Sequence, residues 1–203
     1  MSGPPPRSAA INPGHRRFRK LKFDTRDVTL TVVFTALYAL INLMQMLSPF
    51  GNPSLYGPVQ LRLSDFLIAL AALLGLPVVI GVTSGCIVVN AFGSIGPIDM
   101  IFGALANLLA ATLVMLLRKH RLSACIIGAI PIGVVVGGGY LWMFYPYQAA
   151  ELAFLPAWAT TLISITISSL IAVAVIGYTV LQTLSRPAII EPLKARGLKV
   201  LTS

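Results

Sequence analysis

The stretch Pro58–Ala110 reads PVQLRLSDFLIALAALLGLPVVIGVTSGCIVVNAFGSIGPIDMIFGALANLLA and contains three apolar runs in succession. The runs are separated by breaks at Gly75–Pro77 and Gly93–Pro97. An ionisable group at the centre of a membrane helix costs about 2.5–3.5 kcal/mol, so such groups are usually functional or paired. We expect the polar side chains near these breaks to line one pocket that faces the outside: Arg62, Ser64, Asp65, Asn90 and Asp99.

The composition of the whole chain indicates a membrane protein. Of its 203 residues 57% are hydrophobic and 10% are charged, and the mean hydropathy is +0.87. Long apolar stretches with few charges are typical of transmembrane helices, whereas the alternating segments of a membrane β-barrel are absent. The sequence therefore predicts an all-α, polytopic bundle of six transmembrane helices within residues 27–184, over the ranges 28–47, 59–74, 76–92, 98–117, 122–143 and 156–184.

The net charge of +9 is concentrated in three places. Basic residues fill an N-terminal arm (1–26), which we expect to be disordered and cytoplasmic, a loop at 118–121 and a cytoplasmic tail (185–203). Because Lys and Arg stay in cytoplasmic loops and attract anionic lipids, this pattern predicts an N-in, C-in topology rather than a nucleic-acid partner. The candidate ligand residues then fall in the outer half: Arg62, Asp65, Asn90, Asp99, Glu151, Trp142 and Trp158. A one-sided polar cluster suits a protein that captures a small molecule from outside.

The charged candidates also have structural interpretations. Arg62 and Asp65 are three residues apart and could form an ion pair on one helix face. Asp99 follows Pro97 by two residues, where a helix dipole favours a carboxylate. Glu151 falls in a loop, where it could simply be solvated.

The aromatic and small residues have structural interpretations too. Trp142 and Trp158 could stack on a flat ligand, yet tryptophan gathers at membrane interfaces whatever the function. The pair Thr35 and Ala39 could dock on another membrane protein. Small residues at four-residue spacing also serve internal helix packing.

Catalytic and energy-coupling motifs are missing from the sequence. There is no G-x-x-x-x-G-K-[ST] loop, no H-E-x-x-H, no G-x-S-x-G and no Cys/His cluster. We therefore predict neither an enzyme nor a bound cofactor or metal. A chain that imports a solute without its own nucleotide site needs a partner that supplies the energy.

Three segments resemble a known family of membrane proteins. VQLRLSD at 59–65, GVTSGCIVVNAFGS at 81–94 and GPIDMIFGALANLLAA at 96–111 are similar to the QueT family, the substrate-binding S components of energy-coupling factor (ECF) transporters. The resemblance implies a six-helix plasma-membrane protein that captures a queuosine precursor of the 7-deazaguanine type. It also implies a transmembrane coupling subunit driven by two ATPase subunits, docked on the first helix through Thr35 and Ala39.

The chain departs from the family pattern in two ways. The family typically carries Glu at the position of Asp65, and a Gly-Glu-Ala element in the last span, which has no acidic residue here. Three alternatives therefore stay open: an S component for another vitamin-like solute, an integral-membrane enzyme that uses Asp65 and Asp99, and a plain helical scaffold.

Overall fold

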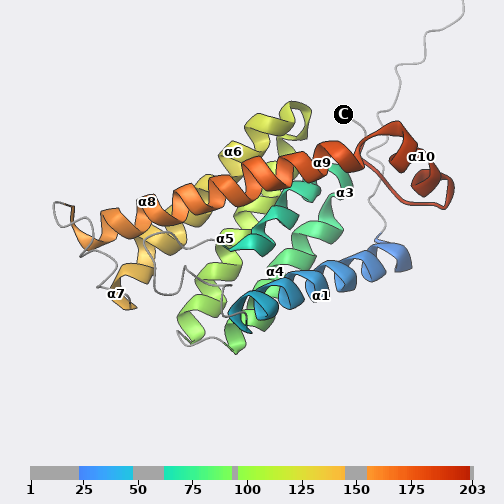
Figure 1. The fold of residues 1–203 in the computed structure, drawn as a ribbon. Helices are drawn as coiled ribbons and strands as arrows, with labels where there is room; N and C mark the ends of the chain where they lie inside the picture. Colours follow the sequence, from blue (N-terminus) through green and yellow to red (C-terminus); the bar gives the residue numbers. More distant parts are fainter. Residues whose placement is uncertain (1–22, 48–61, 93–95, 145–154, 202–203) are drawn as a thin grey trace, which may run out of the picture.

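The computed structural model describes residues 23–47, 62–92, 96–144 and 155–201, and these ranges form a bundle of helices without any strand (Figure 1). The basic arm expected over 1–26 lies almost wholly outside the described residues, as does the loop that carries Glu151. The predicted all-α class is confirmed within the described part of the chain.

The helices follow the six expected segments in order. The elements are α1 (Thr25–Leu47), η1 (Leu63–Leu70) continued by α3 (Ala71–Leu74), α4 (Leu76–Ala91), α5 (Pro97–Leu116), then η2 (Arg118–His120), α6 (Arg121–Ile132), η3 (Gly133–Leu141) and α7 (Trp142–Phe144), then α8 (Ala157–Ser169), η5 (Leu170–Gly177) and α9 (Tyr178–Leu184), and finally α10 (Pro187–Ala195). The short helix α10 in the tail was not predicted from the sequence.

Four of these segments have the length and apolarity to cross a membrane: Thr25–Leu47, Pro97–Leu116, Arg118–Phe144 and Ala157–Leu184. The apolar helices Leu63–Leu74 and Leu76–Ala91 are shorter, and a full crossing takes about 20 residues. The described helices therefore establish a multi-helix membrane architecture, whereas the six-span count depends on how this short pair sits.

The short pair is divided where the sequence places Gly-Leu-Pro. Gly75 adopts φ 74° and ψ −139°, a conformation that glycine reaches without strain. Pro77 stands in the first turn of α4, where its missing N–H costs no hydrogen bond. The break confirms the predicted boundary and turns the chain back into the bundle.

Glycines bring neighbouring helices of the bundle close together. A Cβ on Gly81 would lie 2.6 Å from Phe34 Cβ, and one on Gly85 would lie 2.7 Å from Tyr38 Cβ, so α4 packs closely on α1. Gly137 lies in the same way against Thr161, whose Oγ1 donates to the Gly137 carbonyl over 2.9 Å. These three glycines therefore serve internal helix packing.

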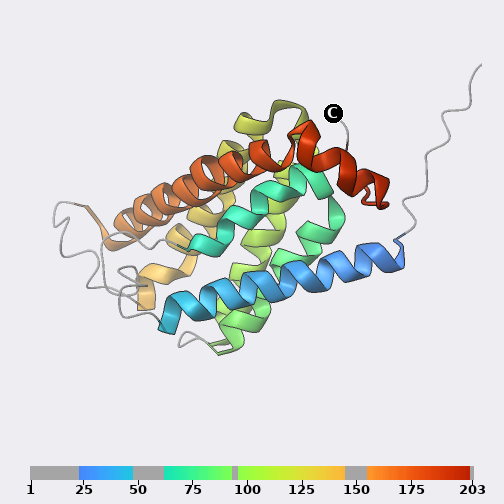
Figure 2. The same ribbon diagram turned by 45° about the vertical axis from the view of Figure 1, so that its right-hand side comes forward.

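The helices α1 and α8–α9 run along opposite sides of the bundle, with α3, α4 and α5 between them (Figures 1 and 2). Close contacts between Gly81 and Phe34 and between Gly85 and Tyr38 show that α1 and α4 run parallel. The N-terminal ends of α1 and α4 consequently lie at the same end of the bundle, which we call the basic end.

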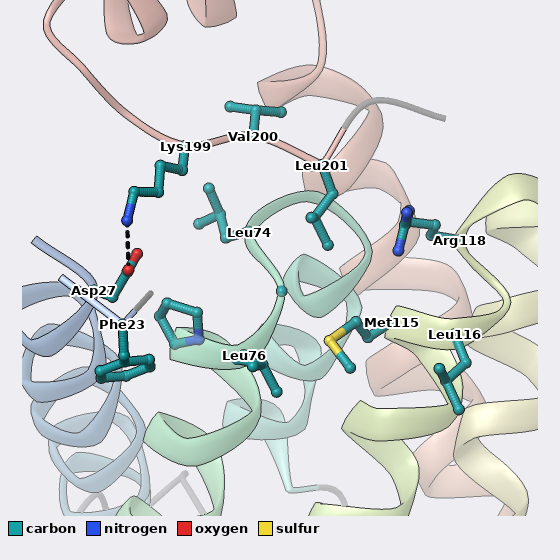
Figure 3. A pocket seen from close by; sticks show the side chains of 12 residues that line it. Phe23, Asp27, Leu74, Leu76, Met115, Leu116, Arg118, Lys199, Val200 and Leu201 are labelled. Carbon is teal, nitrogen blue, oxygen red and sulfur yellow. Dashed lines mark hydrogen bonds and ion pairs between the residues drawn. The ribbon is translucent and has the colours of Figure 1, made fainter. Parts of the chain in front are cut away.

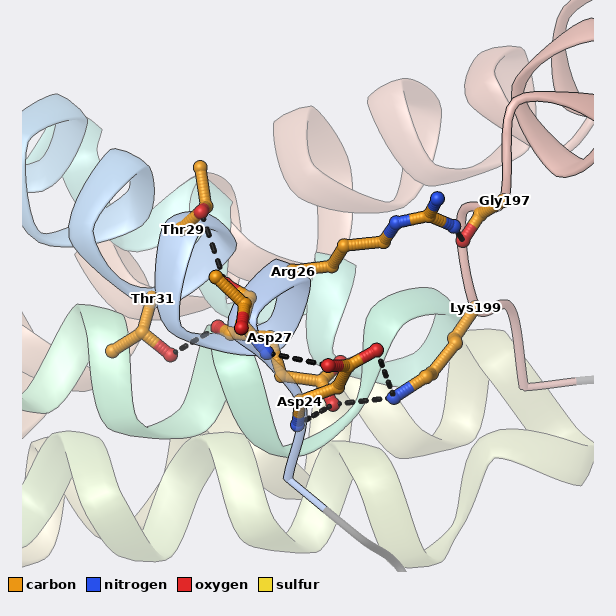
Figure 4. Close-up of polar contacts among 8 residues, drawn as sticks. Asp24, Arg26, Asp27, Thr29, Thr31, Gly197 and Lys199 are labelled. Carbon is orange, nitrogen blue, oxygen red and sulfur yellow. Dashed lines mark hydrogen bonds and ion pairs between the residues drawn. The ribbon is translucent and has the colours of Figure 1, made fainter.

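The tail folds back onto the basic end. Arg26 Nη1 donates to the Gly197 carbonyl over 2.9 Å, and Lys199 Nζ donates to Asp27 Oδ2 over 2.7 Å (Figure 4). Leu201 N donates to the Leu73 carbonyl over 2.8 Å. We call these contacts the tail clasp, and they bring the beginning of α1 and the end of the described chain to one side.

Candidate functional site

Arg62 pairs with Asp99 rather than with Asp65. Arg62 precedes η1 with extended backbone angles (φ −92°, ψ 94°), so it does not share a helical face with Asp65. Its Nη2 lies 3.8 Å from Asp99 Oδ1, with the two side chains 24% and 8% exposed. The alternative of an Arg62–Asp65 pair on one helix is wrong, because Arg62 stands outside the helix that carries Asp65.

Asp99 collects contacts from three elements. It lies in the first turn of α5, after Gly96 (φ 77°) and Pro97. Asn90 Nδ2 of α4 donates to its backbone carbonyl over 2.8 Å, and Tyr140 Oη of η3 donates to its carboxylate Oδ1. The structure thus brings together Arg62, Asn90 and Asp99, as the sequence predicted, and adds Tyr140.

Gly103 makes this approach possible. A Cβ at this position would lie 2.9 Å from Asn90 Nδ2 and 3.2 Å from Asp99 Oδ1. A contact this short requires the neighbouring amide to shift. Glycine at this position of α5 therefore leaves room for the Asn90 amide beside the Asp99 carboxylate.

Asp65 belongs to a second hydrogen-bonded group. Asp65 is 2% exposed to solvent, and its Oδ1 accepts a hydrogen bond from Tyr38 Oη over 2.8 Å. Tyr38 Oη in turn accepts from Asn107 Nδ2 over 2.8 Å. One buried chain of hydrogen bonds therefore joins η1, α1 and α5.

The two groups share one face of α5. Asp99, Gly103 and Asn107 follow at four-residue spacing on α5, so they stand above one another and span about 12 Å of helix axis. On α4, Asn90 lies four residues after Cys86, and Asn90 Nδ2 is 3.4 Å from Cys86 Sγ. We call the combined set the buried polar layer: Tyr38, Arg62, Asp65, Asn90, Asp99, Asn107 and Tyr140.

Sequence reasoning missed Tyr38 and Asn107 as members of this layer. Both carry hydrogen-bonding groups in the middle of apolar helices, and that signal could have identified them. Tyr38 lies four residues after the buried Phe34, and Asn107 lies eight residues after Asp99. These residues join the layer because α1 packs on α4 and η1 packs on α1. Residue spacing within a single helix does not predict which helices pack together.

The two tryptophans differ from the polar candidates. Trp158 is 51% exposed near the start of α8, a position that fits an interfacial anchor better than a ligand-stacking ring. Trp142 is half-buried at the start of α7, next in the chain to the buried Leu141. The ring of Tyr140 packs on Phe102, with centroids 6.0 Å apart. The aromatic residues with polar contacts in the layer are therefore Tyr38 and Tyr140, while Glu151 lies outside the described residues.

Thr35 and Ala39 lie at the edge of the α1–α4 contact. Both are half-buried, and Thr35 Oγ1 donates to the Gly81 carbonyl over 3.2 Å. The fully outward face of α1 carries larger apolar residues, among them Val32 and Leu40, which are 61% and 54% exposed. Docking of a partner through Thr35 and Ala39 stays a prediction, and it would have to include this outward face.

A pocket of about 380 Å³ lies at the basic end, away from the buried polar layer (Figure 3). Its walls come from the α3–α4 turn, the end of α5 and the tail. Arg118 and Lys199 flank a mostly apolar interior in which Leu74 and Leu201 lie. Lys199 is engaged by Asp27 of the tail clasp. This pocket has few convergent polar groups, unlike the buried polar layer.

The layer lacks the grouping expected of a metal centre. Within the described ranges no three His, Cys, Asp or Glu side chains come together in a way that could hold an ion. Asp65 and Asp99 instead bind different neighbours, Tyr38 and the Arg62–Tyr140 pair. The printed contacts of these acids are thus hydrogen bonds and an ion pair with other side chains of the layer.

Comparison with known proteins identifies the family. The family model described as QueT transporter matches residues 28–186. The "Queuosine precursor transporter QueT" of Lactococcus lactis subsp. cremoris (strain MG1363) is 33% identical over 96 residues, which make up 47% of this chain and 53% of that protein. The chain thus matches about half the length of this curated relative. No solved structure matches. With a family match over most of its length and four described helices able to cross a membrane, the chain belongs to the QueT transporter family and has the helices of a multi-pass membrane protein.

Proposed function

We propose that the chain is the substrate-capture S component of an ECF-type, ATP-driven importer and that it takes up a queuosine precursor of the 7-deazaguanine type. The observation that carries this proposal is the buried polar layer, in which two acids, one arginine and two amides meet inside an otherwise apolar bundle. Intramembrane ionisable groups commonly mark a solute site. The named relative supports the substrate class, because it is a queuosine precursor transporter.

The chemistry of the layer suits a flat base with donors and acceptors on its edge. A deazaguanine offers two adjacent N–H donors, which one carboxylate such as Asp65 accepts in parallel. Its carbonyl oxygen accepts from the guanidinium of Arg62, whose side chain is 24% exposed beside Asp99. The layer thereby provides both partners that such an edge requires.

We propose six crossings with both ends in the cytoplasm. The tail clasp supports this topology, because it joins Asp27 near the start of α1 to Lys199 near the end of the described chain. The basic loop at Arg118 lines the same pocket as Lys199, so three basic segments meet at one end. Lys and Arg favour the cytoplasmic side. The layer would then open toward the outside.

Energy must come from another protein in this proposal, since the sequence has no nucleotide-binding loop. We propose a transmembrane coupling subunit driven by two ATPase subunits, docked on α1. The outward face of α1, with Val32 and Leu40, is exposed and apolar, and the half-buried Thr35 and Ala39 lie at its edge. Such a face can pack against a second membrane helix.

A second candidate is an S component for a different vitamin-like solute. It is favoured by Asp65, which is one methylene shorter than the family's usual Glu, and by a last long helix that buries hydroxyls instead of an acid. These hydroxyls belong to Thr160, Thr161, Ser164, Ser168 and Ser169. A site with different reach and polarity would accept a different ligand.

A thermal-shift screen of nucleobases and vitamins on detergent-purified protein tests the proposal, because a ligand that binds only the native state raises its apparent stability. We expect a 7-deazaguanine to raise the melting temperature of the wild type but not of Arg62→Gln. The matched control Lys119→Gln removes an exposed charge outside the layer. A shift by another solute and by no 7-deazaguanine would select the second candidate.

A further inference from the structure

The pocket at the basic end lies where several of the long apolar helices begin or end. The spans Thr25–Leu47 and Pro97–Leu116 each have one end there, and Arg118 opens the next span. The pocket walls include Asp27, in the first turn of α1, and Leu116, the last residue of α5. Because a membrane-crossing helix ends at the membrane surface, the pocket lies at the level of the lipid headgroups.

The interior of this pocket suits a hydrocarbon chain. Its volume of about 380 Å³ falls within the range of about 300–1,000 Å³ that small-molecule sites occupy. Apolar side chains line most of it, and two of them, Phe23 and Leu116, are 47% and 65% exposed. A hydrocarbon chain in the pocket would cover these surfaces, and each methylene group that it buries adds to binding.

The rim of the pocket carries a positive charge that no described residue balances. Lys199 is already engaged by Asp27, with Nζ 2.7 Å from Oδ2. Arg118 is half-buried, and within the described ranges its guanidinium has no carboxylate within 4.0 Å. Figure 3 shows this guanidinium directed toward the pocket, on the side of Leu201. One anionic group would balance Arg118, and a guanidinium binds a phosphate through two parallel hydrogen bonds.

The sequence around the pocket strengthens this preference for an anion. The described segments at this end, residues 23–27, 118–121 and 186–199, hold eight Lys or Arg and three Asp or Glu. Residues 1–22 hold six Lys or Arg and no acid, so this part of the chain is a poor occupant for a positively charged rim. Basic residues beside membrane helices instead attract anionic lipids, and basic pockets between such helices bind their headgroups.

We propose that this pocket binds an anionic phospholipid, with one acyl chain in the apolar interior and the phosphate on Arg118. In the proposed topology the lipid comes from the cytoplasmic leaflet. Val200 and Leu201 form part of the wall, so the lipid packs against the tail. The site is separate from the buried polar layer, and the inference does not depend on which solute that layer takes.

Competition between two phospholipids tests this inference. The purified full chain in a neutral detergent receives equal amounts of phosphatidylglycerol, which is anionic, and phosphatidylcholine, which is zwitterionic, with the same acyl chains. Native mass spectrometry then counts the bound molecules of each. We expect the wild type to prefer phosphatidylglycerol by roughly fivefold, the contribution of one Lys or Arg beside an anionic headgroup. Arg118→Gln should abolish this preference, whereas Arg118→Lys, which keeps the charge, should retain most of it.

Lys119→Gln is the matched control, because it removes an exposed charge of the same loop that does not line the pocket, and it should leave the preference unchanged. Equal retention of both lipids by the wild type, or a preference that survives in Arg118→Gln, would overturn the inference. An equal fall in Lys119→Gln would show a general attraction to the basic end instead of a site. Inorganic phosphate should not displace the lipid, and displacement would show a site for free phosphate that needs no acyl chain.

Discussion

The tail clasp and the buried polar layer use the same side-chain chemistry in opposite circumstances. In the clasp, Asp24 and Asp27 face Lys199, and the lysine and Asp24 side chains are 53% and 56% exposed. In the layer, Asp65 and Asp99 are 2% and 6% exposed, and only Asp99 has a cationic partner among the described residues. Exposed pairs contribute roughly 0–1 kcal/mol, whereas buried charges cost more than they return unless they are fully matched. The contrast supports our proposal that the layer, and not the clasp, binds the transported solute.

The largest effect is expected from removing the guanidinium of the layer. Arg62→Gln leaves Asp99 buried without its counter-charge, and breaking a buried pair on one side costs about 3–5 kcal/mol. Because the Arg62 side chain is 24% exposed, we expect a loss of about 2–3 kcal/mol in the free energy of unfolding. Denaturant unfolding measures this loss of stability. We also expect calorimetry to show at least a hundredfold loss of ligand affinity.

The double variant Arg62→Gln/Asp99→Asn sharpens this comparison. It removes both charges, so it should recover part of the lost stability without recovering ligand binding. If the single variant unfolds and binds like the wild type, the Arg62–Asp99 pair does not matter as described here.

A smaller loss is expected from crowding the layer. Gly103→Ala places a methyl group 2.9 Å from Asn90 Nδ2, and overpacking of this kind costs about 1–3 kcal/mol. The control Gly139→Ala has its nearest neighbour atom at 3.8 Å, and alanine is favoured over glycine in a helix by up to about 1 kcal/mol. Thermal unfolding should rank Gly103→Ala below the wild type and Gly139→Ala at or above it; the reverse order would contradict the packing.

Removing the buried hydroxyl of Tyr38 should weaken ligand binding more modestly. Tyr38→Phe deletes the donor to Asp65 and leaves the Asn107 amide without its acceptor, a loss of about 1–3 kcal/mol for a buried polar group. We expect roughly tenfold weaker ligand binding by calorimetry. Tyr178→Phe is the matched control, because the Tyr178 hydroxyl accepts an exposed hydrogen bond from Gln182 and lies outside the layer. Ligand binding by this variant should equal that of the wild type.

The smallest effect belongs to the clasp. Lys199→Gln removes an ion pair whose lysine is half exposed, so we expect less than about 1 kcal/mol of destabilisation. The difference should shrink in 0.5 M salt, and ligand affinity should not change. A large loss of binding would show that the two regions are coupled and would break the comparison.

Much of the fold follows from patterns that act within one segment. The Gly75–Pro77 break, the helix start at Pro97 and the apolar runs predicted the order of helices, because turn chemistry and hydropathy are local properties. The tail helix α10 escaped prediction because it is short and polar on one side. The number of crossings was not settled by length, since Leu63–Leu74 and Leu76–Ala91 are short.

The sequence predicted several residues of the site but not which side chains contact each other there. Arg62, Asn90 and Asp99 were identified because ionisable and amide groups are rare in apolar runs. The pairing of Arg62 with Asp99 was not predicted, because it depends on the extended backbone that precedes η1. Tyr38 and Asn107 entered the layer through packing of α1 and α5 around η1, which is a tertiary property.

The central claim is that the buried polar layer, and not the pocket at the basic end, holds the transported solute. A structure of the full chain with a bound 7-deazaguanine tests this most directly. We predict ligand density within hydrogen-bond distance of the Asp65 carboxylate, with the Arg62 guanidinium on the same molecule. Density for the deazaguanine between Arg118 and Lys199, with the layer unchanged, would contradict the account.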